Sequence, residues 1–379
     1  MIKIKSDKII VGESLFDGYI YVENGKIDEI TKENRAAEKE YVYTGKYVSA
    51  GFIDLHTHGA GGYAFMNSTV EDVIAGCDYH LRHGTTSILP TVSAGEFQTM
   101  KNAVVNIHKA KGKTKANMLG AHLEGPYLSP MQAGAQCPKF ITPPVKADYE
   151  SLIEEYGESI ARWTYAPEND ENGAFCAFLT ERGIIASAGH TDAKYPDMER
   201  AIEKGCNLIT HLYSCTSTVT RKQGFRSLGV IESAYLRDEL YVEIIADGKH
   251  LPPDLIKMIV KIKGTDKVAL ITDSLEIAGT DVTEGVMSGT EFIVEDRVCK
   301  LKDRSAFAGS VATADTLIRT LVNDCGFALP TAVKMLTEVP AKILSVKKGK
   351  IEKGYDADII VFDDDVQVGD VFVGGVLIS

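Results

Sequence analysis

Eight short apolar runs, separated by longer amphipathic or polar stretches, dominate the middle of this 379-residue chain. In the first such stretch Val70, Val73, Cys77 and Leu81 recur at intervals of three or four residues, which predicts a helix. Strands that alternate with helices are typical of a parallel (β/α)8 barrel, which normally takes about 250 residues. The runs are residues 52–55, 87–89, 118–123, 163–166, 184–188, 208–210, 241–245 and 268–271.

A doubly wound open sheet is the alternative for the same pattern, but no GxGxxG motif follows the first run. We therefore expect one barrel over residues 51–344. The terminal segments, 1–50 and 345–379, consist of short alternating stretches with turns such as Asn24-Gly25. Neither end can form a stable sheet alone, so we expect both to share one small discontinuous β-domain, a β-sandwich.

One stretch near the end of the barrel region differs from the rest. Residues 277–301 are rich in Thr, Gly and Val and predict a hairpin inserted after the eighth strand. That position is above the barrel mouth, where lids form.

The charge balance excludes some partners. With 41 basic and 53 acidic residues the net charge is −12, which is unfavourable for binding nucleic acid phosphates. The chain has no apolar stretch of the roughly 18 residues that span a membrane, and no apolar leader. Seven cysteines occur without a CxxC pair, as in a reducing compartment. These features predict a cytoplasmic protein that binds neither nucleic acid nor membrane.

Polar residues with metal-binding side chains follow most of the apolar runs. In a barrel the carboxyl ends of the strands meet at one rim, where active sites are built. Histidines and a carboxylate from different strands are typical zinc ligands, and a water on the metal becomes a hydroxide near neutral pH. Asp273 at the same rim is a candidate base for that water and acid for a leaving amine. The residues at the rim are His56, His58, Glu124, His190, His211, His250 and Asp273.

For the other histidines, and for two of those at the rim, roles other than metal binding must be considered. His80, His83 and His108 are expected on helix surfaces, without a function. His122 shares the strand face of Glu124, and a supporting or core role is favoured over metal binding. His56 and His58 are two residues apart on one strand, so they can orient the site or bind metal directly.

Several motifs, in order along the chain, resemble those of the amidohydrolase superfamily and, within it, the N-acetylglucosamine-6-phosphate deacetylases. The first is Gly51-Phe52-Ile53-Asp54-Leu55-His56-Thr57-His58, and the most specific is His122-Leu123-Glu124-Gly125-Pro126. The others are Gly189-His190-Thr191-Asp192, Thr210-His211-Leu212-Tyr213, Ile244-Ile245-Ala246-Asp247-Gly248-Lys249-His250, Leu270-Ile271-Thr272-Asp273, Ala308-Gly309-Ser310 and Gly354-Tyr355-Asp356-Ala357-Asp358.

This resemblance implies a role for each matched residue. Glu124, His190 and His211 are expected to hold the principal divalent metal, with zinc as the first expectation and Fe²⁺ or Mn²⁺ as alternatives. His56 and His58 occupy the place where some members bind a second ion, so one or two ions per subunit are expected. Asp273 is expected to be the general acid and base, Gln136 to polarise the acetamide carbonyl, and His250 to contact the sugar phosphate or a ring hydroxyl.

The chain departs from the family after His211. Where the family reads Asn-Ala, this chain has Ser214 and Cys215, and both are expected to contact substrate. The phosphate-binding arginine is matched by Arg226, which follows the extra basic pair Arg221-Lys222. In the family this arginine can reach across a dimer interface, so a homodimer is expected.

The resulting hypothesis is hydrolysis of N-acetylglucosamine 6-phosphate to glucosamine 6-phosphate and acetate, in amino-sugar metabolism. Because the loop after His211 is altered, two alternatives stay open on the same scaffold: N-acetylgalactosamine 6-phosphate or another N-acyl substrate. A non-catalytic sugar-phosphate-binding protein is a third alternative, although no metal-ligand or base position is lost.

Overall fold

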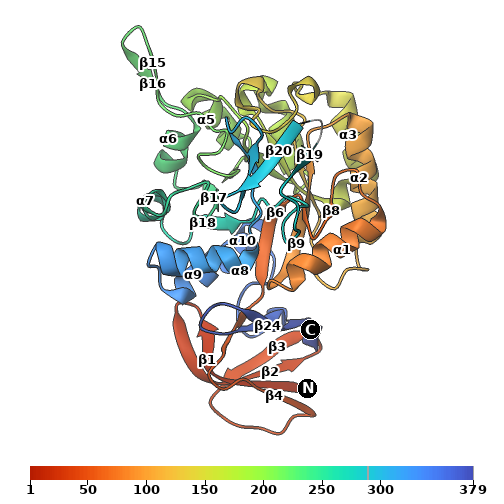
Figure 1. Cartoon of the computed structure of the whole chain (residues 1–379), viewed down its shortest axis with the longest axis vertical. Helices are drawn as coiled ribbons and strands as arrows, with labels where there is room; N and C mark the ends of the chain where they lie inside the picture. The colour runs from red at the N-terminus through yellow and green to blue at the C-terminus, as the bar shows by residue number, and fades with distance from the viewer. Residues whose placement is uncertain (288–289, 379) are drawn as a thin grey trace.

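The computed structural model describes residues 1–287 and 290–378. The eight apolar runs form eight parallel strands of a barrel, so the predicted (β/α)8 fold is confirmed (Figure 1). The strands pair in chain order, and the last meets the first where Asp273 N donates to His56 O at 2.9 Å and His58 N donates to Ser274 O at 2.7 Å. The barrel strands are β6 (Phe52–Thr57), β9 (Thr85–Ser93), β11 (Ala121–Glu124), β12 (Ile160–Tyr165), β13 (Ile185–Ala188), β14 (Leu208–Ile209), β17 (Tyr241–Ile245) and β18 (Val268–Ile271).

Helices surround the barrel strands (Figure 1). The first begins at the N-cap Thr69, whose hydroxyl accepts from Asp72 N while the Asp72 carboxylate accepts from Thr69 N. The second buries one face that includes Met100, Val104 and Ile107. Within the described ranges, no helix is both long and apolar enough to cross a membrane. The helices are α1 (Val70–Leu81), α2 (Phe97–Ala110), α3 (Lys146–Tyr156), α4 (Ala174–Thr180), α5 (Tyr195–Glu203), α6 (Val230–Leu236), α7 (Pro253–Lys263), α8 (Ala314–Arg319), α9 (Leu329–Met335) and α10 (Glu338–Leu344).

The amino-terminal end of the barrel is covered. Ile53 and Leu55 of β6 belong to the same buried apolar cluster as Val339 and Ile343 of α10. Ile53 N, at the start of the strand, donates to Leu336 O at 2.8 Å. A ligand site is therefore left to the opposite end, where the strands finish.

The two ends of the chain share one mixed sheet, which lies below the barrel in Figure 1. The segment that precedes the strand at Ile359–Phe362 approaches the turn at Gly25, because Ile27 N donates to Tyr355 O and Ala357 N donates to Gly25 O, both at 2.9 Å. The sheet therefore folds around its own apolar cluster, which includes Ile20. Its strands are β1 (Ile2–Val11), β2 (Ser14–Glu23), β3 (Lys26–Thr31), β4 (Lys39–Val42), β5 (Tyr47–Ala50), β23 (Ile359–Phe362), β24 (Val368–Val373) and β25 (Val376–Leu377).

The insertion after β18 is larger than the expected hairpin. It forms a four-stranded antiparallel sheet that continues to Gly309, beyond the predicted limit of residue 301. The single-hairpin prediction was wrong because residues 277–301 already contain three strands, and residues 307–309 add a fourth that pairs with the third. Residues 288–289 of the predicted segment lie outside the described residues. The strands are β19 (Glu284–Met287), β20 (Thr290–Glu295), β21 (Val298–Leu301) and β22 (Phe307–Gly309).

A second hairpin projects from the barrel as an arm (Figure 1). It consists of β15 (Thr220–Lys222) and β16 (Phe225–Ser227), and all side chains of residues 218–227 are exposed. Arg221 and Arg226 are directly opposite each other in its register, so both guanidinium groups leave the same face.

Candidate metal and active site

A cavity of about 550 Å³ opens at the carboxyl ends of the barrel strands. Glu124 lines it as the last residue of β11. His190, His211 and Asp273 each lie two residues beyond a strand, after β13, β14 and β18 respectively. These side chains come from four different strands, and the barrel brings them to one rim because its parallel strands all end there.

Glu124, His190 and His211 form a compact triangle. Glu124 Oε1 lies 3.1 Å from His190 Nε2 and 3.0 Å from His211 Nε2, and the two nitrogens are 3.2 Å apart. A tetrahedral zinc ion with bonds of about 2.0–2.1 Å separates its ligands by about 3.3 Å. The three atoms therefore have the chemistry and the spacing that a divalent cation needs.

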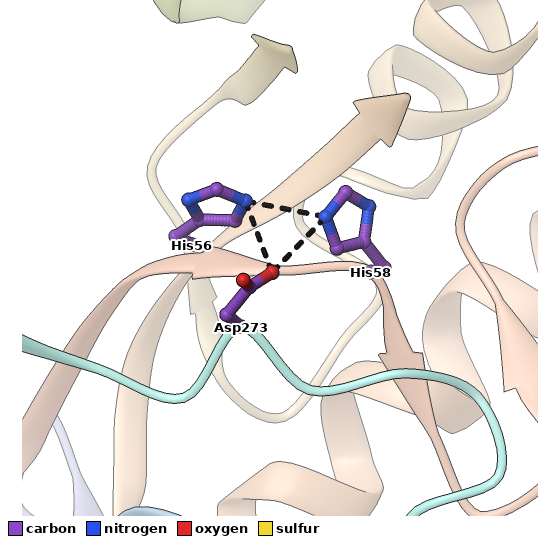
Figure 2. Close-up of side chains that lie close together, drawn as sticks. All are labelled: His56, His58 and Asp273. Atoms are coloured by element: carbon purple, nitrogen blue, oxygen red, sulfur yellow. Dashed lines mark hydrogen bonds and ion pairs between the residues drawn. The ribbon is translucent and has the colours of Figure 1, made fainter. Parts of the chain in front are cut away.

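His56, His58 and Asp273 form a second triangle beside the first, which Figure 2 shows. The two Nε2 atoms are 3.2 Å apart, and Asp273 Oδ1 lies 3.3 Å from His56 Nε2 and 3.2 Å from His58 Nε2. Glu124 links the two groups, because its Oε1 lies 3.4 Å from His56 Nε2 and its Oε2 lies 3.3 Å from His58 Nε2. Glu124 therefore lies between the two groups of potential ligands.

Three of these imidazoles are oriented through their second nitrogen. Nδ1 lies 2.9 Å from Gln132 O in His190, 3.0 Å from Ser214 O in His211 and 2.9 Å from Ser93 Oγ in His58. A carbonyl only accepts, so in His190 and His211 Nδ1 carries a proton, and the neutral imidazole then has a bare Nε2. A bare Nε2 is the form that binds a metal.

The electrostatics of the cluster keep its carboxylates ionised and favour positive charge on the neighbouring histidines. Burial favours the neutral carboxyl of Asp273, but His56 and His58 outweigh it and lower the pKa of Asp273 to about 2. Burial likewise opposes charge on His56, but Asp273 and Glu124 raise the pKa of His56 to about 10. The pKa of Glu124 is also held well below its ordinary value by the surrounding histidines, against the effect of burial. Two buried negative charges therefore require protonated imidazoles or a bound cation.

The residues expected to contact substrate are placed as follows. Gln136 donates from Nε2 to Glu124 Oε2 at 2.7 Å, and its Oε1 accepts from Ala94 N at 3.1 Å. Ser214, Cys215 and His250 line the cavity together with it. His250 Nδ1 lies 2.8 Å from Asp247 Oδ2, which holds the ring at the cavity wall.

Arg226 is the exception among the expected residues. It lies on the exposed arm, where its Nη1 donates to Gly224 O at 3.1 Å, and it does not line the cavity of its own chain. Among the described residues that line this cavity there is no lysine or arginine.

Two histidines outside the cluster are also informative. His122 lies between Thr91 Oγ1 at 3.1 Å and Thr164 Oγ1 at 2.7 Å, below the ligand triangles. His80 is fully buried on α1, with Nε2 at 2.9 Å from Thr57 Oγ1 and 3.1 Å from Gly59 O. The prediction of a surface position for His80 was wrong, because the helix turns this histidine toward the strand that carries His56 and His58.

Sequence reasoning missed part of the cavity wall. The four-stranded insertion was expected above the barrel mouth, but the sequence did not show which of its apolar residues line the cavity. Ser93 could have been identified as a rim residue, because the second strand continues through Val92 and its last residue is Ser93. The missed lining residues are Met66, Asn67, Ser93, Leu275, Glu276, Val286, Phe292, Leu301 and Phe307.

Comparisons with known proteins agree with this geometry. Residues 47–378 match the model of the amidohydrolase family. The chain is 33% identical to an N-acetylglucosamine-6-phosphate deacetylase of Haemophilus influenzae, over 87% of this chain and 86% of the relative. It is 29% identical to an N-acetylgalactosamine-6-phosphate deacetylase of a Shewanella species, over 92% of this chain and 87% of the relative. The crystal structure of N-acetylglucosamine-6-phosphate deacetylase from Pasteurella multocida superposes with a TM-score of 0.92 at 29% identity, covering 100% of this chain and 99% of that one.

Proposed function

Because the chain belongs to the amidohydrolase family and, within it, to the N-acetylglucosamine-6-phosphate deacetylases, we propose that it hydrolyses the acetamide of N-acetylglucosamine 6-phosphate. The products are glucosamine 6-phosphate and acetate. The observation that carries this proposal is the triangle of Glu124, His190 and His211 at the barrel rim, with Asp273 beside it.

Glu124, His190 and His211 are the residues that would hold the principal cation. His56 and His58, with Asp273 and the second oxygen of Glu124, would hold another. A divalent cation there supplies Lewis acidity, since it lowers the pKa of a water and polarises a carbonyl oxygen. The all-nitrogen and carboxylate donor set suits zinc, and elemental analysis of the purified protein tests both its identity and its stoichiometry.

Asp273 is proposed to move the proton. Its carboxylate is ionised and faces the histidine cluster at 3.2–3.3 Å, so it can accept a proton from the attacking water. The same oxygen then delivers the proton to the departing amine nitrogen, which leaves as a neutral amine.

Gln136 and His250 are proposed to place the substrate. The Gln136 amide keeps one N–H beyond the one it donates to Glu124, and this second donor suits the oxygen of the acetamide. His250 is fixed by Asp247 and suits a ring hydroxyl or phosphate oxygen of the sugar.

A sugar phosphate needs a positively charged partner, and no described residue that lines the cavity is a lysine or an arginine. We infer a homodimer in which the arm of one subunit brings Arg226 to the cavity of the other. Three features support this arrangement: the arm extends from the barrel, it carries two arginines on one face, and Phe225 at its tip is 79% exposed.

Mixed dimers test this inference. Subunits carrying Arg226→Ala and subunits carrying Asp273→Asn would be coexpressed with different tags, and the heterodimer would be purified on both. It should regain activity that neither parent has at low substrate concentration, because one of its two sites combines an intact Asp273 with an intact Arg226. A heterodimer no more active than its parents would refute the crossing arm.

An acetate-release panel tests the substrate. N-acetylglucosamine 6-phosphate should be turned over with the highest kcat/KM among the gluco and galacto sugars with and without phosphate. The galacto epimer is the second candidate, since the Shewanella relative is named for it and the loop at Ser214 and Cys215 is altered. A higher kcat/KM for the galacto phosphate would transfer the assignment to that substrate, and no acetate from either would refute the deacetylase.

A further inference from the structure

A buried ion pair crosses the interior of the barrel directly below the candidate ligands. Arg162 of β12 and Glu243 of β17 are both fully buried, and Arg162 Nη2 donates to Glu243 Oε2 at 2.8 Å while Nη1 donates to Oε1. The other N–H groups of Arg162 donate to Ser187 Oγ at 3.1 Å, Thr210 Oγ1 at 2.7 Å and Leu55 O at 3.2 Å. The bidentate contact with Arg162 therefore keeps Glu243 ionised and holds its carboxylate in this part of the barrel interior.

The stability of the fold does not explain such a pair. The free-energy cost of removing both charges from water offsets most of their attraction, and apolar residues of similar volume often stabilise a fold equally well or better. The surroundings of Glu243 indicate another role for the pair, because Glu243 Oε2 also lies 4.0 Å from Nδ1 of His56.

His56 forms one possible ligand set with His58 and Asp273 and another with Glu124 and His211. Its Nε2 faces Glu124 and Asp273, so Nε2 must be bare to bind a cation and Nδ1 must carry the proton. Within the described structure, this buried Nδ1 has no hydrogen-bond partner, unlike Nδ1 of His58, His190 and His211. A movement of about 1 Å would bring Glu243 Oε2 to hydrogen-bond distance.

We propose that Glu243, held by Arg162, is the positioning residue for His56: its carboxylate accepts the Nδ1 proton and thereby keeps Nε2 directed at the cation site that His56 shares with His58 and Asp273. The inference rests on the proposed metal-dependent function. It adds a residue that contacts neither substrate nor cation and acts only through His56.

Two matched double variants separate this role from a purely structural one. Arg162→Met with Glu243→Gln removes the ion pair but keeps an oxygen that accepts from Nδ1. Arg162→Met with Glu243→Met removes the pair and the acceptor, with a side chain of similar length. Neither variant leaves a buried charge unpaired, which is the change that most endangers folding.

The readout is Zn²⁺ affinity, measured by competition with a chromophoric chelator, after urea unfolding has shown that both variants fold. The glutamine variant should bind Zn²⁺ nearly as tightly as the wild type, and the methionine variant about 10- to 100-fold more weakly. Equal affinities in the two double variants, whether high or low, would overturn the proposal. Wild-type protein that binds no Zn²⁺ would overturn the proposed function as well, so the two failures are distinguishable.

A measurement on the wild type covers the case in which a variant does not fold. In Zn²⁺-loaded protein labelled with ¹⁵N-histidine, long-range ¹H–¹⁵N correlations should show His56 protonated at Nδ1, with the low-field proton of a hydrogen bond to a carboxylate. Protonation of His56 at Nε2, or an Nδ1 proton without that hydrogen bond, would overturn the proposal independently of the variants.

Discussion

Lowering the pH from 7.5 to 5 should destabilise the folded chain by about 2 kcal/mol through one residue, His80 of α1. Burial lowers the pKa of His80 to about 4, and the hydrogen bond to Gly59 O only partly opposes this effect. The geometry gives the reason: Nε2 uses its proton on Gly59, and among the described residues Nδ1 has no partner for a second one. Protonation would place a buried charge behind the strand that carries His56 and His58.

The size and sign of the effect follow from linkage. An unfolded histidine titrates near 6.5, so above that pH both states are neutral and the full stability is present. As the pH falls below 6.5 the unfolded chain takes up a proton that folded His80 refuses until about pH 4, and stability is lost across this window. At pH 5 the difference amounts to about 2 kcal/mol, and at pH 4 and below it approaches about 3 kcal/mol.

The assay compares the wild type with His80→Gln, whose amide nitrogen can replace the Nε2 donor but does not titrate. Both proteins would be unfolded in urea at pH 7.5 and at pH 5, with chelator present so that metal binding does not contribute. The stability lost between the two pH values should be about 2 kcal/mol smaller in the variant, and other titrating groups cancel in this comparison. An equal loss in both proteins would show that His80 is not the neutral buried imidazole described above.

The remaining predictions concern the active site. Asp273→Asn should keep the cation held by Glu124, His190 and His211, as elemental analysis would show, and lose about 10²- to 10⁴-fold in kcat, because the proton acceptor is removed; near-normal turnover would refute the base assignment. Arg226→Ala should raise KM for the phosphorylated sugar by about 10- to 100-fold and leave KM for the dephosphorylated sugar unchanged, and equal effects on both would show that it does not bind the phosphate. Gln136→Ala should lower kcat about 10²- to 10³-fold with little change in metal content, and a change in KM alone would assign it to ground-state binding.

The barrel could be predicted because buried parallel strands are read directly from apolar runs. The runs at 241–245 and 268–271 have the same bounds as β17 and β18. Once the barrel is inferred, the positions of Glu124 and Asp273 at strand ends place them on one rim, without any knowledge of side-chain contacts.

The pairs that cross the barrel could not be predicted. Arg162 and Glu243 are 81 residues apart in sequence, and each is a lone charge beside or within an apolar run. His80 was missed for a related reason, since a histidine among polar helix residues is assigned to the solvent face. In both cases the partner lies on a different element, far away in the sequence, and only the folded structure identifies it.

The backbone at the rim explains why the candidate ligands are already directed at one another. His190, His211 and Asp273 have φ values of 45°, 29° and 48°, in the left-handed region that costs a residue with a side chain about 1–3 kcal/mol. Hydrogen bonds from neighbouring segments hold these turns: Ser129 N donates to His190 O at 2.8 Å, and Asp273 N donates to His56 O. The strain is thus borne by the closed barrel, which orients the side chains before any ligand binds. Asn adopts this region more readily than most residues, so Asp273→Asn removes the carboxylate's basicity with the turn intact, whereas Asp273→Val would lose both and could not separate proton transfer from geometry.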